Sequence, residues 1–176
     1  IAMPNLKKPI TSSELCEDYR REINKLANNK YFQPLIPCYL TDDTDLEDFE
    51  LALQKNIFFG AKLYPANATT NSKYGVTNID KIYPALELLD KYNKPLLVHG
   101  EKVSEEISIF DREKFFIDNE LLKIINKFPS LKIVLEHVSS KYGADFVAQT
   151  KNLAGTITPH HMLITKKDVF QETINE

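Results

Sequence analysis

Three residues that could take part in metal chemistry each stand at the end of a largely apolar run. The residues are Lys62, His99 and His137, and the runs cover positions 57–61, 95–98 and 131–136. Runs of this length suggest buried strands, and in a parallel sheet or barrel the carboxyl ends of the strands form the edge where ligands bind. Imidazole is a good zinc ligand. The three positions together therefore predict a metal site.

The lysine needs a chemical explanation, because an ammonium group has no lone pair for a metal. A neutral lysine can react with CO2 to give a carbamate, an anion whose two oxygens can bridge two metal ions. Burial near other cations lowers a lysine pKa and favours this neutral form. Taken singly, Lys62 could also be a core-edge lysine that reaches solvent, and each histidine a hydrogen-bonded structural residue. The combination of all three favours the metal site.

Strand-like and helix-like segments alternate along the chain. We predict strands at residues 1–3, 35–40, 57–63, 95–98, 131–135 and 153–157, and helices at residues 11–27, 45–55, 77–92, 111–128 and 139–150, with a last helix from Thr165 or Asp168. Repeated βα units of this size indicate a parallel sheet covered by helices.

The predicted fold is α/β: a partial TIM-like (β/α)8 barrel of about six βα units. Residues 1–176 are expected to form one domain, since a complete barrel needs about 250 residues. An open doubly wound sheet is the alternative. It is disfavoured because no glycine-rich phosphate loop follows any predicted strand, and the chain has only five glycines.

Composition excludes several classes of function. The formal net charge is −3 and there is no basic stripe, so no nucleic-acid partner is expected. No apolar run is long enough for a transmembrane span, and the first residues do not read as a signal peptide. Cys16 and Cys38 form no metal-type pair and suggest two buried thiols. These features predict a cytoplasmic protein without a membrane partner.

The residues around the three candidate ligands resemble dihydroorotase, specifically the bacterial single-function type of the amidohydrolase superfamily. The long run Ala61-Lys62-Leu63-Tyr64-Pro65-Ala66-Asn67-Ala68-Thr69-Thr70 carries most of the resemblance. Matching segments lie, in the right order, at residues 3–5, 38–42, 98–101, 109–113, 136–137 and 156–161. The resemblance therefore extends over essentially the whole chain.

This resemblance implies a barrel with two zinc ions that lower the pKa of water and polarise a carbonyl. Lys62 would be the N6-carboxylated lysine bridging both metals, and His99 and His137 would complete the ligation of one. Asn5 would contact the substrate carboxylate, and a mobile loop bearing Thr69 and Thr70 would close over the substrate.

The implied reaction is the reversible hydrolysis of the cyclic amide of (S)-dihydroorotate to N-carbamoyl-L-aspartate, a step in pyrimidine synthesis. The partner would be this small molecule, and a homodimer is possible.

Two parts of the family pattern are missing from this sequence. There is no His-x-His pair, and no segment matches the last strand with its metal-binding, proton-carrying aspartate. Asp168 lies in a predicted helix and is a poor substitute. No catalytic acid or base is therefore assigned, and the 176 residues alone are expected to be inactive. Two open sheet edges are expected to make them less stable than a whole barrel.

Five other polar residues near these motifs are interpreted as structural. Glu136 should point away from His137 if their strand is regular. His160 and His161 should pack or hydrogen-bond near a strand end. Arg112, together with Asp111, resembles a charged helix start.

Two alternatives remain at this stage. One is a catalytically dead dihydroorotase-like protein that acts as a scaffold or binding partner, which the missing His-x-His pair would also fit. The other is another cyclic amidohydrolase, such as a hydantoinase. Retention of Lys62, His99, His137 and the complete Thr-Thr loop favours the enzyme.

Overall fold

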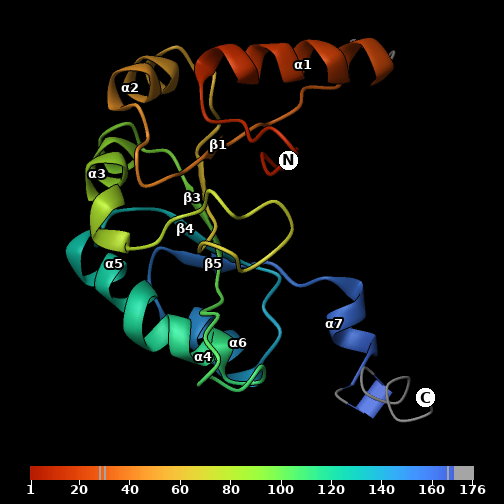
Figure 1. Ribbon diagram of the computed structural model, residues 1–176, viewed down its shortest axis with the longest axis vertical. Helices are drawn as coiled ribbons and strands as arrows, with labels where there is room; N and C mark the ends of the chain where they lie inside the picture. The colour runs from red at the N-terminus through yellow and green to blue at the C-terminus, as the bar shows by residue number, and fades with distance from the viewer. Residues whose placement is uncertain (28, 30, 166, 169–176) are drawn as a thin grey trace.

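The computed structural model describes residues 1–27, 29, 31–165, 167 and 168. Helices and strands alternate along them (Figure 1). In chain order the elements are α1 (Ser13–Ala27), β1 (Cys38–Tyr39), α2 (Leu46–Gln54), β2 (Ala61–Leu63), a 3-10 helix (Ile79–Ile82), α3 (Tyr83–Lys91), β3 (Leu96–His99), α4 (Arg112–Phe116), a π-helical segment (Ile117–Leu121), α5 (Leu122–Lys127), β4 (Ile133–Glu136), α6 (Lys141–Gln149), β5 (Leu153–Gly155) and α7 (Pro159–Leu163).

The described strands form one parallel sheet in the order β1-β2-β3-β4-β5. Each new strand is added beside the previous one, as in the wall of a barrel. A doubly wound sheet would reverse its strand order at a switch point, and this sheet does not. The prediction of an α/β, partial barrel-like fold is confirmed.

The strand predicted at residues 1–3 is wrong. This segment makes a hydrogen bond from Ala2 N to Leu35 O at 2.9 Å but has no strand geometry. Pro4 follows and lacks an N–H, so a ladder cannot continue there. Residues 35–40 likewise shorten to β1, which begins directly after Pro37. Residues 1–165, apart from positions 28 and 30, therefore contain five strands rather than six, and the predicted last helix lies largely outside the described residues.

Successive side chains of each strand point alternately to the apolar core and to the face that carries the site. The apolar core beneath the helices includes the strand residues Cys38, Ala61, Leu63, Leu96, Val98, Ile133 and Leu135. In Figure 1, α2, α3 and α5 lie along one side of the strands, while the N-terminal segment and the loop after β2 lie on the other. The intervening residue of β2, Lys62, points away from the core yet is only 1% exposed.

Two composition-based predictions can be compared with the structure. Both Cys16 and Cys38 are buried and free, as predicted. Among the helices of the described residues, none combines the length and apolar character that crossing a bilayer requires.

The Glu113 carboxylate joins α4 to the start of α6. It accepts hydrogen bonds from the backbone N–H groups of Ser139 at 2.9 Å and Ser140 at 3.1 Å, and from both hydroxyl groups. Ser140 in turn caps α6 by accepting from Gly143 N at 3.0 Å. These bonds satisfy backbone donors that a helix start leaves unpaired. They also fix the turn that follows His137.

We expect Glu113→Ala to destabilise the protein by about 1–3 kcal/mol, because it leaves backbone donors without their charged acceptor. Urea denaturation followed by circular dichroism would measure the loss. Glu87→Ala, at an exposed position on α3, is the matched control and should change stability by less than about 0.5 kcal/mol. Equal effects of the two substitutions would contradict the assigned role of Glu113.

Candidate metal and substrate site

A cleft of about 520 Å³ opens at the carboxyl ends of the strands. It is lined by Met3, Asn5, Lys62, Tyr64, Thr69, His99, Glu136, His137, Thr156, Thr158, His160 and His161. Five of the six site residues predicted from sequence are among them. The sixth, Thr70, is not a lining residue, although its backbone carbonyl accepts a hydrogen bond from Asn5 Nδ2 at 3.0 Å. His160 behaves as predicted, since its ring bonds to Thr158 Oγ1 at 3.2 Å.

The two candidate metal-binding histidines face each other. His99 Nδ1 lies 3.0 Å from His137 Nε2. Two nitrogen ligands of one tetrahedral zinc ion, at about 2.0–2.1 Å each, would be about 3.3 Å apart. Burial, reinforced by the nearby His99 and Lys62 charges, lowers the pKa of His137 to about 4, so this ring is neutral near pH 7. The pair therefore suits one zinc ion.

Lys62 reaches the same cleft from β2. Its Nζ pairs with a Glu136 carboxylate oxygen and lies 4.9 Å from the centre of the Tyr64 ring. Burial lowers the lysine pKa, although the Glu136 charge opposes that shift. A lowered pKa favours the neutral amine that carbamate formation needs. Within the described residues there is no cluster of three or more His, Cys, Asp and Glu side chains suited to a metal. The candidate metal donors in this cleft remain the two histidines and, only if it is carboxylated, Lys62.

The predicted orientation of Glu136 is wrong. It pairs in register with His99 across β3 and β4 and points to the same face as Lys62. The prediction assumed that a regular strand continued through His137. Instead, His137 has a φ of +46°, in the left-handed region that non-glycine residues rarely adopt. This turn brings the His137 ring to the face that Glu136 already occupies.

The unusual backbone of His137 is held by the segment after β5. His137 N donates to Thr156 Oγ1 at 2.8 Å, and Val138 N donates to Thr156 O at 2.8 Å. Such bonds offset the cost of a left-handed conformation. From sequence, Thr156 was quoted only within the matching segment 156–161 and inside the strand predicted at 153–157, and it was not proposed as a site residue. The structure ends β5 at Gly155.

The polar loop after β2 is tied down over the cleft through Asn5. Tyr64 Oη donates to Asn5 Oδ1 at 2.9 Å, which orients the amide. Asn71 Nδ2 donates to Asn5 O at 2.8 Å, and Tyr39 Oη donates to Asn71 O at 3.2 Å. Tyr39, Tyr64 and Asn71 were missed by the sequence analysis, because hydrogen bonds across such sequence separations leave no local pattern.

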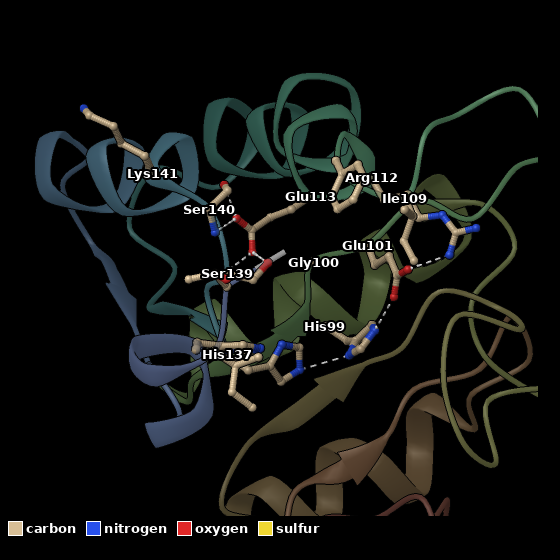
Figure 2. A pocket seen from close by; sticks show the side chains of 14 residues that line it. His99, Gly100, Glu101, Ile109, Arg112, Glu113, His137, Ser139, Ser140 and Lys141 are labelled. Carbon is tan, nitrogen blue, oxygen red and sulfur yellow. Dashed lines mark hydrogen bonds and ion pairs between the residues drawn. The ribbon is translucent and has the colours of Figure 1, made fainter. Parts of the chain in front are cut away.

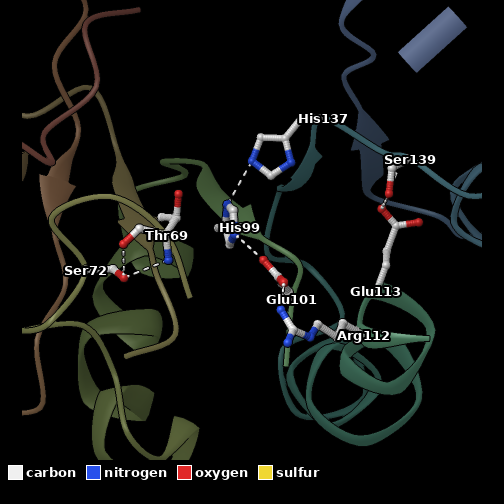
Figure 3. A network of polar contacts seen from close by, with 8 residues as sticks. All are labelled: Thr69, Ser72, His99, Glu101, Arg112, Glu113, His137 and Ser139. Carbon is white, nitrogen blue, oxygen red and sulfur yellow. Dashed lines mark hydrogen bonds and ion pairs between the residues drawn. The ribbon is translucent and has the colours of Figure 1, made fainter. Parts of the chain in front are cut away.

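That loop also stabilises itself. Ser72 Oγ donates to Thr69 O at 2.6 Å and accepts from Thr69 N at 2.9 Å (Figure 3). The short turn keeps Thr69 at the rim of the cleft.

Arg112 stands at a helix start, as predicted, because α4 begins at this residue, but its side chain also makes a contact that the sequence did not indicate. Its Nη1 donates to Glu101 Oε1 at 3.0 Å, and Glu101 Oε2 lies 3.1 Å from His99 Nε2 (Figure 2). The hydrogen bond with His99, followed by the contact with Arg112, lowers the pKa of Glu101 even though burial opposes this. Asp111 does occupy the N-cap position of α4, but without a side-chain capping bond.

Comparison with known proteins gives a consistent result. The chain is 45% identical to dihydroorotases from Buchnera aphidicola and Photorhabdus laumondii, with 99% and 94% of this chain and 51% and 48% of those proteins aligned. From these coverages, the chain spans about half the length of the curated relatives it matches. No protein-family model matches the chain.

Solved structures agree. Dihydroorotase from Saccharomyces cerevisiae, in complex with 5-fluoroorotic acid, superimposes with a TM-score of 0.85 at 33% identity, over 98% of this chain and 51% of that one. The Campylobacter jejuni enzyme gives a TM-score of 0.84 at 38% identity, over 96% and 48%. An L-hydantoinase from Arthrobacter aurescens gives 0.73 at 14% identity, over 98% and 42%, and shares the fold.

The Lys62–Glu136 pair generates a stability prediction. In metal-free protein, Lys62→Met should cost about 3–5 kcal/mol, because it leaves the Glu136 charge buried without a partner. Adding Glu136→Gln should recover part of that loss. Urea denaturation of the two single variants and the double variant in CO2-depleted buffer would measure the coupling. If the losses of unfolding free energy in the two single variants simply add in the double variant, the result would count against a buried ion pair.

Proposed function

Since this chain belongs to the dihydroorotase family, we propose that the active protein containing it interconverts (S)-dihydroorotate and N-carbamoyl-L-aspartate by reversible hydrolysis of the ring amide. The observation that carries the proposal is the facing pair His99 Nδ1 and His137 Nε2, 3.0 Å apart, beside buried Lys62. The work would be done in the cytoplasm on a small-molecule substrate. The homodimer suggested by the resemblance stays a prediction.

The residues present suit zinc as the cofactor. His99 and His137 would bind one ion through these two nitrogens, and N6-carboxylated Lys62 would bridge it to a second. When bound, zinc supplies Lewis acidity toward the amide carbonyl and toward water. The burial of Lys62 contributes by favouring the neutral amine that reacts with CO2, against the opposing charge of Glu136.

Substrate binding falls to Asn5 and the loop after β2. The Asn5 amide, held by Tyr64 through its oxygen, presents its N–H groups toward the loop and the cleft. A substrate carboxylate would compete there with the Thr70 carbonyl for Asn5 Nδ2. Thr69 and Thr70, on the loop after β2, would then cover the substrate and exclude water.

No acid–base catalyst is assigned within the described residues. Glu136 lines the cleft but is committed to Lys62, and Asp168 is hydrogen-bonded to Thr165 rather than lining the cleft. We therefore propose that these 176 residues alone turn over little or no dihydroorotate. The hydantoinase likeness concerns the fold alone, and no observation favours that substrate.

Lys62→Ala tests the function directly. In the whole protein we expect loss of bound zinc and a fall in kcat/KM of about 10³-fold or more, since metal chemistry supplies several kcal/mol. Zinc would be counted by elemental analysis, and dihydroorotate hydrolysis would be followed by absorbance. Lys123→Ala, on the exposed side of α5, is the control.

Added acetate or propionate should partly restore Lys62→Ala activity, because a small carboxylate can supply oxygen ligands in the vacated space. A wild-type protein that holds no zinc and turns over no dihydroorotate, with Lys62→Ala leaving partner binding intact, would instead support the scaffold alternative.

Asn5→Ala tests substrate binding. Loss of a hydrogen bond to a charged carboxylate should reduce kcat/KM by about 10- to 100-fold, mostly through KM. Steady-state kinetics of the whole protein would show the division between kcat and KM. Asn119→Ala, on the exposed surface beside α4, serves as control. An unchanged KM would refute the role of Asn5.

A further inference from the structure

The two ring nitrogens of His99 have different partners. Nε2 faces the Glu101 carboxylate at 3.1 Å, and Nδ1 faces His137. A carboxylate only accepts hydrogen bonds, and a neutral imidazole has one N–H and one lone pair. The geometry therefore assigns the N–H to Nε2 and leaves the Nδ1 lone pair directed toward the candidate metal position.

We propose that Glu101 and Arg112 are positioning residues that hold His99 in this tautomer and orientation for metal binding. The inference rests on the proposed function, because it concerns the same metal site. Carboxylates that accept the free N–H of a metal-binding histidine fix its ring and raise its basicity. Glu101 and Arg112 do not line the substrate cleft but an adjoining pocket of about 610 Å³, which His99 and His137 also line (Figure 2). Their contact with the substrate cleft runs through the His99 ring, so they would act through His99.

The chain fixes Glu101 by a tight turn. Glu101 N donates to His99 O at 3.0 Å, which folds the glutamate back beside the histidine ring. The residue between them is Gly100, and a Cβ added there would collide with the Leu135 side chain. A larger residue at position 100 would therefore have to displace the end of the Leu135 side chain on β4. The absence of a side chain at Gly100 lets the turn lie close against β4.

Arg112 completes the arrangement from α4. Its Nη1 binds Glu101 Oε1 at 3.0 Å, so each carboxylate oxygen has one partner (Figures 2 and 3). The loop is also fastened to the helix by a backbone bond from Lys102 N to Arg112 O at 3.2 Å. The Glu101 and Arg112 side chains are 27% and 26% exposed, so water screens the pair only in part.

The test measures zinc affinity in the whole protein by competition with a chromophoric chelator. We expect Glu101→Gln to weaken zinc binding about 10- to 100-fold. Glu101→Asp, which keeps the charge, should bind zinc more tightly than Glu101→Gln. The control is Glu106→Gln, an exposed glutamate on the same loop, which should bind zinc like wild type.

Arg112→Met should weaken zinc binding less than Glu101→Gln, and the double variant should be no worse than Glu101→Gln alone, because Arg112 acts through Glu101. The visible spectrum of the cobalt-substituted protein should shift in Glu101→Gln, which a purely structural role would not cause. The urea midpoint of each variant shows whether it is folded. If Glu101→Gln is unfolded, the zinc affinity of Glu101→Asp is compared with that of wild type instead.

The outcomes separate the two hypotheses. Zinc affinity and a cobalt spectrum unchanged in Glu101→Gln, with wild type binding zinc and active, would overturn the positioning role alone. Wild-type protein that binds no zinc would overturn the metal assignment and the proposed function with it.

Discussion

The buried charge of Lys62 is the constraint on which the site depends. An ammonium group that is 1% exposed cannot be hydrated, so it needs a charged partner or must lose its proton. Glu136 is that partner, yet β2 and β4 are separated by β3. In the register of the sheet Lys62 lies level with Leu97 and Val134. Glu136 lies two residues further along the same face of β4, and its carboxylate pairs with the Lys62 ammonium across that offset. The register of the sheet is therefore inseparable from the chemistry of the cleft.

The same pair explains why lysine carboxylation and metal binding would belong together under the proposed function. A carbamate changes Lys62 from a cation to an anion, which would place two negative charges beside each other at Glu136. Like charges in a buried site repel strongly unless cations compensate them. The imidazole rings of His99 and His137 lie next to this position and could hold such a cation. Without one, the ammonium–carboxylate pair is the arrangement that satisfies both side chains.

Sequence predicted the βα alternation well, because apolar runs and helix starts are local signals. It also brought Lys62, His99 and His137 to one edge. It failed where geometry departs from a regular strand: the positive φ of His137 brings its ring to the same face as Glu136, where a regular strand would separate the two. It also failed for pairs far apart in sequence. Nothing near Arg112 reveals Glu101, and nothing near Thr156 reveals His137, because both contacts depend on how the loops pack.

Those loops share one anchor, the first turn of α4. Arg112 binds Glu101 in the loop after β3, and the next residue, Glu113, binds Ser139 and Ser140 after β4. Each loop directly follows one of the two histidines. Two adjacent side chains of opposite charge therefore hold both loops at the start of one helix. Pairing of the strands alone would not fix the loops in this way. The 3.0 Å separation of the histidine nitrogens thus depends on the docking of α4 as much as on the sheet.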